Sequence, residues 1–249
     1  MLVILAHAHD APARSLADRW RAHGGDAGVL TCADLSVAGW RHEAAAPRAG
    51  RAVIAGAVVP THEIEAVITR VAGISDQELH WIHPADRSYA AAEMEAFLLA
   101  WLAALPCAVV NRPTAECLAG PMRSAEQWAA IARRLGIPTR PRRRGVSFAS
   151  SATQAVIDET TVTVHVAGRR SFIDGQPADD LPVGRMALTL AREANTAMLR
   201  ATFAREPDAR FVGAAPVIDV ADPAIADALL DHCMGMPVLR HVETRVALA

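Results

Sequence analysis

Short apolar runs of strand length, each leading into a helical pattern, dominate the first half of the chain and constrain its fold most. The first run, LVILA at residues 2 to 6, leads to Asp10, a helix-capping residue type, and to Pro12, which suits a first helical turn. The helix is predicted to end before Gly24 and Gly25. A strand followed at once by a helix is half of a β-α-β unit, so the sequence predicts an α/β domain.

The alternation of strands and helices continues to about residue 115. In chain order the patterns predict strands near Gly28–Thr31 and Ala52–Val59, a helix at Thr61–Ala72, an apolar helix at 84–104, and a buried strand, CAVVN, at 107–111. We therefore expect residues 1–115 to form a doubly wound, mainly parallel sheet with covering helices.

The pattern changes after a linking helix. GPMRSAEQWAAIARRLGIPTRP, residues 120–141, predicts a helix that starts near Ser124 and stops at Gly136 and Pro138. The later elements are predicted as a β-hairpin around Gly168 at 160–174, a helix at 183–204, a strand pair or bent strand at 211–220, and a helix at 222–234. Strands mixed with two helices indicate an α+β second domain over residues 120–249.

Composition excludes several classes of partner. The net charge is -2 and the pI is about 6.5, so neither nucleic acid nor an anionic membrane is an expected partner. The most apolar run, residues 96–110, contains Pro106 and is too short to span a bilayer, and the N-terminus lacks the basic start of a signal peptide. The four cysteines show no C-x-x-C or metal-ligand spacing. We expect a cytoplasmic globular protein.

The chain contains no lysine, because all 25 residues counted as Lys or Arg are arginine. Arginine serves well on a solvated surface, but its forked guanidinium does not place charge where an ammonium would. The absence of lysine excludes Schiff-base catalysis, a lysine general base and a P-loop lysine.

Three stretches, in order, resemble the ATP-grasp superfamily, in particular ligases that modify ribosomal peptides and protein termini. They are the opening LVILAHAHDAPARSLADRWRAHGGDAGVLTCADL, the passage AVVNRPTAECLAGPMRSAEQWAAIARRLGIPTRP, and the segment from VTVHVAGRRSF to FVGAAPVIDVADP. The first resembles the pre-ATP-grasp domain, and the other two resemble the ATP-binding half. The resemblance implies a pre-ATP-grasp-like domain followed by a shortened ATP-grasp-like domain.

The resemblance also implies where ATP and Mg²⁺ would be held, and the sequence departs from the family at these places. The family uses two lysines on the ATP phosphates; Arg123 stands at the first position, and the second has no candidate. Between Gly145 and Thr161 the chain is too short for the family's glycine-rich lid. Where the family has a magnesium-binding Glu-x-Asn-Pro motif, this chain has Asp219, with Asp222 before the proline. Hard cations accept such oxygen ligands, but Asp222 equally fits a helix cap.

Asn111 and Arg112 close the strand at the domain junction, which in the family faces nucleotide and substrate. They are candidate ligand-binding residues. The alternative is that Asn111 simply ends the strand and Arg112 lies on the surface. A separate candidate is a metal site built on His7, His9 and Asp10 at the end of the first strand, completed by His80 or His83; the alternative is a helix cap beside polar loop residues. The arginines in 140–144 form either a docking patch for an acidic ligand or an exposed turn.

These observations lead to one expectation and two alternatives. We expect a degenerate ATP-grasp-like protein without catalytic residues or cofactor, which binds a peptide substrate or an intact biosynthetic enzyme during peptide modification and forms a homo- or hetero-oligomer. The first alternative is an active ATP-dependent carboxylate-amine ligase with a minimal lid, which uses Arg123 for phosphate and Asp219 and Asp222 for Mg²⁺. The second is a metal-dependent enzyme that uses His7, His9 and Asp10.

Overall fold

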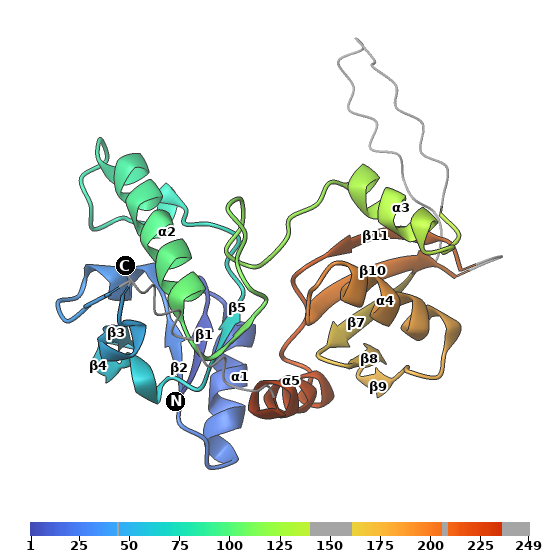
Figure 1. The fold of residues 1–249 in the computed structure, drawn as a ribbon, viewed down its shortest axis with the longest axis horizontal. Helices are drawn as coiled ribbons and strands as arrows, with labels where there is room; N and C mark the ends of the chain where they lie inside the picture. Colours follow the sequence, from blue (N-terminus) through green and yellow to red (C-terminus); the bar gives the residue numbers. More distant parts are fainter. Residues whose placement is uncertain (44, 140–160, 206–208, 236–249) are drawn as a thin grey trace, which may run out of the picture. The chain divides into compact units, whose positions relative to one another are not determined.

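The computed structural model describes residues 1–43, 45–139, 161–205 and 209–235. The chain forms two compact units (Figure 1). The first unit comprises Met1–Met122 with Asp219–Ala249, and the second comprises Arg123–Ile218. The sequence pattern alone places all of 120–249 in the second domain.

The first unit is built on the parallel sheet that the sequence predicts. Its strands are β1 (Leu2–Leu5), β2 (Ala27–Leu30), β5 (Ala66–Thr69) and β6 (Ala108–Val110), in the order β2-β1-β5-β6, and every neighbouring pair is parallel. Almost every residue of these strands is buried. Continuous apolar strands are typical of a parallel sheet that is covered on both faces.

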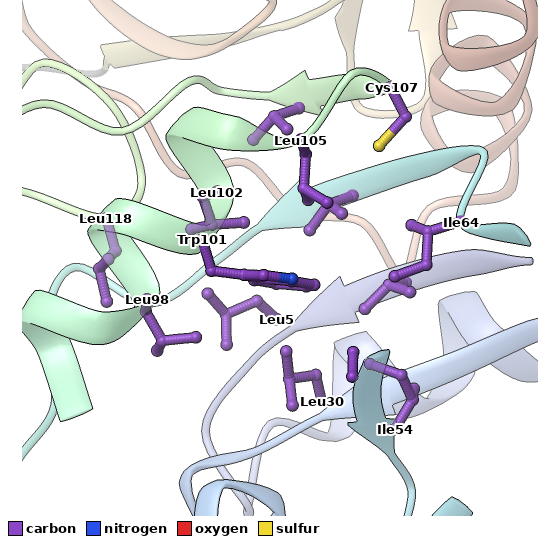
Figure 2. Packing of buried hydrophobic residues seen from close by; sticks show 14 of the residues in the cluster. Leu5, Leu30, Ile54, Ile64, Leu98, Trp101, Leu102, Leu105, Cys107 and Leu118 are labelled. Carbon is purple, nitrogen blue, oxygen red and sulfur yellow. The ribbon is translucent and has the colours of Figure 1, made fainter. Parts of the chain in front are cut away.

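Two long helices pack on this sheet. In α1 (Ala11–Ala22), Asp10 is the N-cap and accepts a hydrogen bond from the Ala13 amide. The second helix, α2 (Arg87–Ala104), points Leu98, Trp101 and Leu102 at the strands (Figure 2). Each of these three side chains is almost fully buried, and burial of one such side chain contributes about 1.5–3 kcal/mol to folding.

Two predictions in this half are wrong. The expected strand at 52–59 is a hairpin of β3 (Arg51–Ile54) and β4 (Ala57–Pro60), because Ala55 and Gly56 both adopt positive φ and reverse the chain. The expected helix at 61–72 is a 3₁₀ turn, η3 (Thr61–Glu63), followed by the central strand β5. Its apolar residues pair with both β1 and β6, and that pairing outweighs the local helical pattern. Three further 3₁₀ turns are η1 (Cys32–Ser36), η2 (Pro47–Ala49) and η4 (Asp76–Glu78).

The helix α5 (Pro223–Gly235) belongs to the first unit. Trp20 of α1 is fully buried, and its indole N–H donates to the carbonyl oxygen of Ala226 at 3.3 Å. Arg19 forms a bidentate pair with Asp227, with nitrogen-to-oxygen distances of 2.9 and 2.7 Å. These contacts explain why the segment that starts at Asp219 returns to the first unit instead of staying with the α+β fold.

The second unit is a five-stranded antiparallel sheet. Its strands are β7 (Thr161–Ala167), β8 (Arg170–Ile173), β9 (Gln176–Pro177), β10 (Met198–Ala204) and β11 (Phe211–Ala215), in the order β11-β10-β7-β8-β9. The predicted hairpin around Gly168 is present as β7 and β8. The helices α3 (Ala125–Arg134) and α4 (Pro182–Glu193) share one apolar core with β7, β10 and β11.

Helix α3 starts where the sequence predicts. Ser124 is its N-cap and forms a capping box with Gln127, and Gly136 follows the helix with φ 71°. The predicted helix at 183–204 is wrong in its second half: α4 ends at Glu193, Asn195 adopts φ 53°, and the chain continues as β10. In the predicted strand at 211–220, only Phe211–Ala215 is a strand. Within the described part of the chain, none of the helices combines the length and apolarity needed to cross a membrane.

Candidate functional site

The carboxyl ends of the four parallel strands bring several polar residues to one edge of the first sheet. His7 follows β1, Cys32 follows β2, Arg70 follows β5 and Asn111 follows β6. Open α/β sheets bind ligands in a crevice outside the carboxyl ends of their strands, where the strand order reverses. The edge is therefore the first candidate site.

Arg70 and Asp10 form a nearly buried ion pair at this edge. The two side chains are 8 % and 13 % exposed, and Arg70 Nε donates to Asp10 Oδ2 at 2.8 Å. Asp10 also caps α1 through the Ala13 amide. Both oxygens of Asp10 are thus used within the protein. Arg70 was not predicted as a site residue, because the local pattern assigns residues 61–72 to a helix.

His7 is held by Glu78, a residue that no sequence motif singled out. His7 Nδ1 lies 2.5 Å from Glu78 Oε1, and the Cys32 thiol donates to Glu78 Oε2 at 3.3 Å. Burial, together with the hydrogen bond to Glu78, raises the pKa of Cys32 to about 12, so this thiol is not a nucleophile near neutral pH. No simple sequence pattern links these three residues, since His7 follows β1, Cys32 begins η1 and Glu78 ends η4.

The metal site predicted from His7, His9 and Asp10 is not assembled. Among the residues that the structure describes, no three His, Cys, Asp or Glu side chains form a group suited to a metal ion. Asp10 is directed to Arg70 and His7 to Glu78, so these side chains do not converge on one point.

Asn111 is a buried residue that shapes the loop after β6. It is 2 % exposed, its side-chain amide donates to the Ala119 carbonyl at 3.2 Å, and its own carbonyl accepts from the Thr69 hydroxyl at 2.8 Å. Gly120, with φ 102°, passes so close that an added Cβ would lie 2.7 Å from the Asn111 Cβ. Asn111 therefore supports the loop, and Arg112 reaches back to the Cys107 carbonyl at 3.4 Å. Ligand binding by either residue stays a prediction.

Arg123, the candidate phosphate ligand, belongs to the second unit and packs on an aromatic ring. Its guanidinium carbon lies 5.7 Å from the centre of the Trp128 ring, at the start of α3. The Arg123 Nε and the Trp128 indole nitrogen are buried, and neither has a hydrogen-bond partner among the described residues. Part of this cation is therefore used in packing.

Asp219 and Asp222, the candidate magnesium ligands, interact with nearby backbone. Asp222 caps α5 and accepts from the amides of Ala224 and Ile225 at 2.8 and 3.2 Å. Asp219 accepts from the Ala221 amide at 3.0 Å. The helix-cap interpretation of Asp222 is thus present in the structure, and a magnesium role for the pair stays a prediction. The arginine patch at 140–144 and the short segment at 145–161 lie outside the described residues, apart from Thr161.

The second unit has a further candidate surface, the sheet face opposite α3 and α4, which we call the helix-free face. Because side chains alternate along a strand, those of the core shared with α3 and α4 lie on one face, and the other face also includes the buried residues Ala167, Met198 and Ala204. On the helix-free face, β7, β10 and β11 carry Thr161, Thr163, His165, Ala167, Met198, Arg200, Thr202, Ala204, Gly213 and Ala215. These described strands place no carboxylate there.

Comparisons with known proteins identify the architecture. No protein-family model matches the sequence, and no curated protein matches it. Solved structures do match: ATP-grasp ligase PsnB complexed with minimal precursor, Mg and ADP is 14 % identical, with a TM-score of 0.63 over 93 % of this chain and 98 % of that chain.

Two other solved structures agree. Macrocyclase MdnC bound with precursor peptide MdnA, from Microcystis aeruginosa MRC, is 14 % identical, with a TM-score of 0.66 over 92 % of this chain and 99 % of that chain. A RiPP-associated ATP-grasp ligase from Chryseobacterium gregarium, in complex with ADP and a leader and core peptide, is 11 % identical, with a TM-score of 0.63 over 95 % and 97 %. The chain therefore has the fold of the ATP-grasp ligases.

Proposed function

We propose that this chain binds a peptide while that peptide is being modified. In this proposal it has the ATP-grasp fold but does not carry out ATP-dependent ligation. The peptide part of the proposal is supported by the similar structures, because PsnB and MdnC are complexed with precursor peptides. In this proposal the chain acts by binding a peptide or an intact biosynthetic enzyme, which is the role expected from the sequence.

One observation supports the proposed loss of nucleotide chemistry, namely that the described strands of the helix-free face carry no acidic side chain and no lysine. Transfer of a phosphoryl group needs cations and metal ions placed around the phosphates, and Mg²⁺ is held by carboxylates. The described strands place no Asp or Glu on this face, and the chain has no lysine. Arg123, the candidate substitute, stacks on Trp128. The described strands of this face thus offer a magnesium nucleotide neither a carboxylate nor a lysine.

Thermal unfolding with saturating magnesium ATP tests this proposal. A ligand at about 100 times its Kd stabilises a fold by about 2.7 kcal/mol, which for a chain of this size raises the Tm by about 5–11 °C. We expect no shift with ATP and Mg²⁺ together, in protein shown to be folded by circular dichroism. A shift of that size would overturn the proposal and favour the active ligase.

The ligase alternative makes its own prediction about site residues. It requires Arg123 to hold phosphate and Asp219 and Asp222 to hold Mg²⁺. Under that alternative, Arg123→Ala and Asp219→Ala each abolish the ATP-induced shift, whereas Arg185→Ala, a matched change at an exposed residue of α4, leaves it unchanged. Binding that survives both site changes would exclude this mechanism.

A further inference from the structure

A cavity of about 340 Å³ lies in the second unit, where the turn between β7 and β8 meets the end of α4. Gly168 adopts φ 64° at the first position of this turn, and its amide donates to the Ala197 carbonyl at 2.7 Å. This hydrogen bond holds the turn against the segment that follows α4. The described residues that line the cavity are Gly168, Arg169, Leu188, Ala191, Arg192 and Thr196.

Two arginines from different elements line this cavity, and neither has a partner within the described part of the chain. Arg169 occupies the second position of the turn, Arg192 lies in the last turn of α4, and both are exposed. No hydrogen bond or ion pair with a described residue engages either guanidinium. Glu193, the acid next to Arg192 in the chain, pairs instead with Arg134 at 3.0 Å.

The end of α4 leaves these two positive charges uncompensated. The carbonyl oxygens of a last helical turn normally disfavour an anion, but here they are used within the protein. The Ala191 carbonyl accepts from the amide and the hydroxyl of Thr196 at 2.9 and 3.4 Å, and the Arg192 carbonyl accepts from the Asn195 amide at 3.0 Å. The described lining residues include no Asp or Glu. The cavity therefore favours an anion over a cation.

The remaining lining residues decide which anion fits. Leu188 is half-buried and Ala191 is buried, so part of the lining is apolar. A phosphate typically binds free backbone amides at a helix N-terminus, whereas the Gly168 amide is already used by Ala197. A free α-ammonium group would meet two arginines and no carboxylate among the described lining residues.

These features fit a carboxylate that carries an apolar side chain and a blocked amine, which is the chemistry of a peptide C-terminus. The volume is at the lower end of the range for small-molecule sites, about 300–1,000 Å³. It therefore suits the last residue of a chain better than a longer segment.

We propose that this cavity binds the C-terminal carboxylate of a peptide that ends in a compact apolar residue. Arg169 and Arg192 donate to the carboxylate oxygens, and Leu188 contacts the apolar side chain. Hydrogen bonds between a guanidinium and a carboxylate are among the strong ones in proteins, and no covalent step is involved. The inference rests on the proposed function and deepens it, because it names the end of the peptide that is recognised.

Fluorescence anisotropy of Gly-Gly-Gly-Leu, labelled with fluorescein at its amine and titrated with the full chain, tests the cavity. The label blocks the amine, and the glycines keep it away from the carboxylate. We expect the free acid to bind at least about tenfold more tightly than the C-terminal amide, because the amide lacks the charge-assisted hydrogen bonds. Labelled tetraglycine acid should bind more weakly than the leucine peptide, because it leaves Leu188 uncovered.

Arg169→Gln and Arg192→Gln should each weaken binding of the free acid by about tenfold and leave binding of the amide unchanged. Arg185→Gln is the matched control, because Arg185 is an exposed arginine of the same helix and is not among the described residues that line the cavity. Equal losses in all three variants would reduce the binding to general charge attraction and overturn the proposal. Equal affinity for acid and amide would also overturn it, as would displacement by inorganic phosphate where acetate at equal ionic strength has no effect.

Magnesium ATP, tested separately by thermal unfolding, keeps the two proposals distinct. Arginine-dependent binding of the free acid together with an ATP-induced shift would support this cavity and overturn the loss of nucleotide chemistry. No binding of the leucine peptide and no ATP shift would overturn the cavity alone. Circular dichroism of each variant confirms that the comparison is made between folded proteins.

Discussion

The ion pair between Asp10 and Arg70 is a nearly buried interaction at the carboxyl edge of the first sheet. Asp10 joins two elements, because one carboxylate caps α1 and accepts from the side chain that follows β5. Removal of one partner of a buried pair leaves the other charge uncompensated, and that costs more than the pair itself contributes.

Asp10→Ala is therefore expected to lower the free energy of unfolding by about 3–5 kcal/mol. Urea denaturation followed by circular dichroism measures the loss. Asp18→Ala is the control, because Asp18 is 72 % exposed and pairs with Arg21 only on the surface, where an ion pair contributes about 1 kcal/mol or less. Similar losses in the two variants would contradict the role assigned to Asp10.

In helix α4 a tertiary contact reverses the usual preference for alanine over glycine inside a helix. Gly184 lies inside the first turns of α4, where glycine is normally less stable than alanine. However, a Cβ at this position would overlap the Ala178 carbonyl oxygen and lie 2.7 Å from the Ser171 hydroxyl oxygen. The helix approaches the β8–β9 region so closely that only glycine fits.

We expect Gly184→Ala to lower the stability of the protein by about 1–3 kcal/mol, because the backbone must shift to relieve the overlap. Gly235→Ala, at the end of α5, is the matched change without a close contact. It should be neutral or stabilise by up to about 1 kcal/mol through helix propensity. Thermal unfolding of both variants provides the test, and a gain in Tm for Gly184→Ala would refute the packing argument.

Across the whole molecule, the absence of lysine gives the protein an unusually simple alkaline titration. Between about pH 9 and 12 the side chains that titrate are four cysteines and one tyrosine. Tyr89 is exposed, whereas all four cysteines are buried. Burial raises the pKa of Cys32 and Cys233 to about 12 and that of Cys107 to about 11, and it also raises the pKa of Cys117.

Each thiol has a higher pKa in the folded state than in the unfolded state. Its contribution to the free energy of unfolding is therefore fully present below the unfolded pKa and is lost as the pH rises toward the folded pKa. The unfolded thiols ionise from about pH 9, while the native thiols stay protonated. The free energy of unfolding should thus fall between about pH 9 and 11, with each thiol contributing at most about 1.4 kcal/mol per pH unit. Urea denaturation under reducing conditions measures this slope, and Cys107→Ala should flatten it. An unchanged slope in that variant would count against the cysteine assignment.

Local sequence signals predicted a large part of the fold. The apolar runs of β1, β2 and β6, the capping chemistry of Asp10 and Ser124, and the turn at Gly168 all act between near neighbours, so they can be recognised without tertiary information. The alternation of strands and helices also predicted the α/β first unit and the mixed second unit. The lysine-free composition by itself excludes whole classes of chemistry, because those reactions need an amine that no residue of the chain supplies.

Only the tertiary structure decided between helix and strand at β5 and β10. A short apolar run fits a buried strand and a buried helix equally, and these runs became strands because neighbouring strands offered backbone hydrogen bonds. The same non-local pairing joins Asp10 to Arg70 and places Arg200 on the helix-free face, opposite the core. Such placements depend on register between segments far apart in the chain, so side-chain chemistry was predictable from the sequence while its spatial grouping was not.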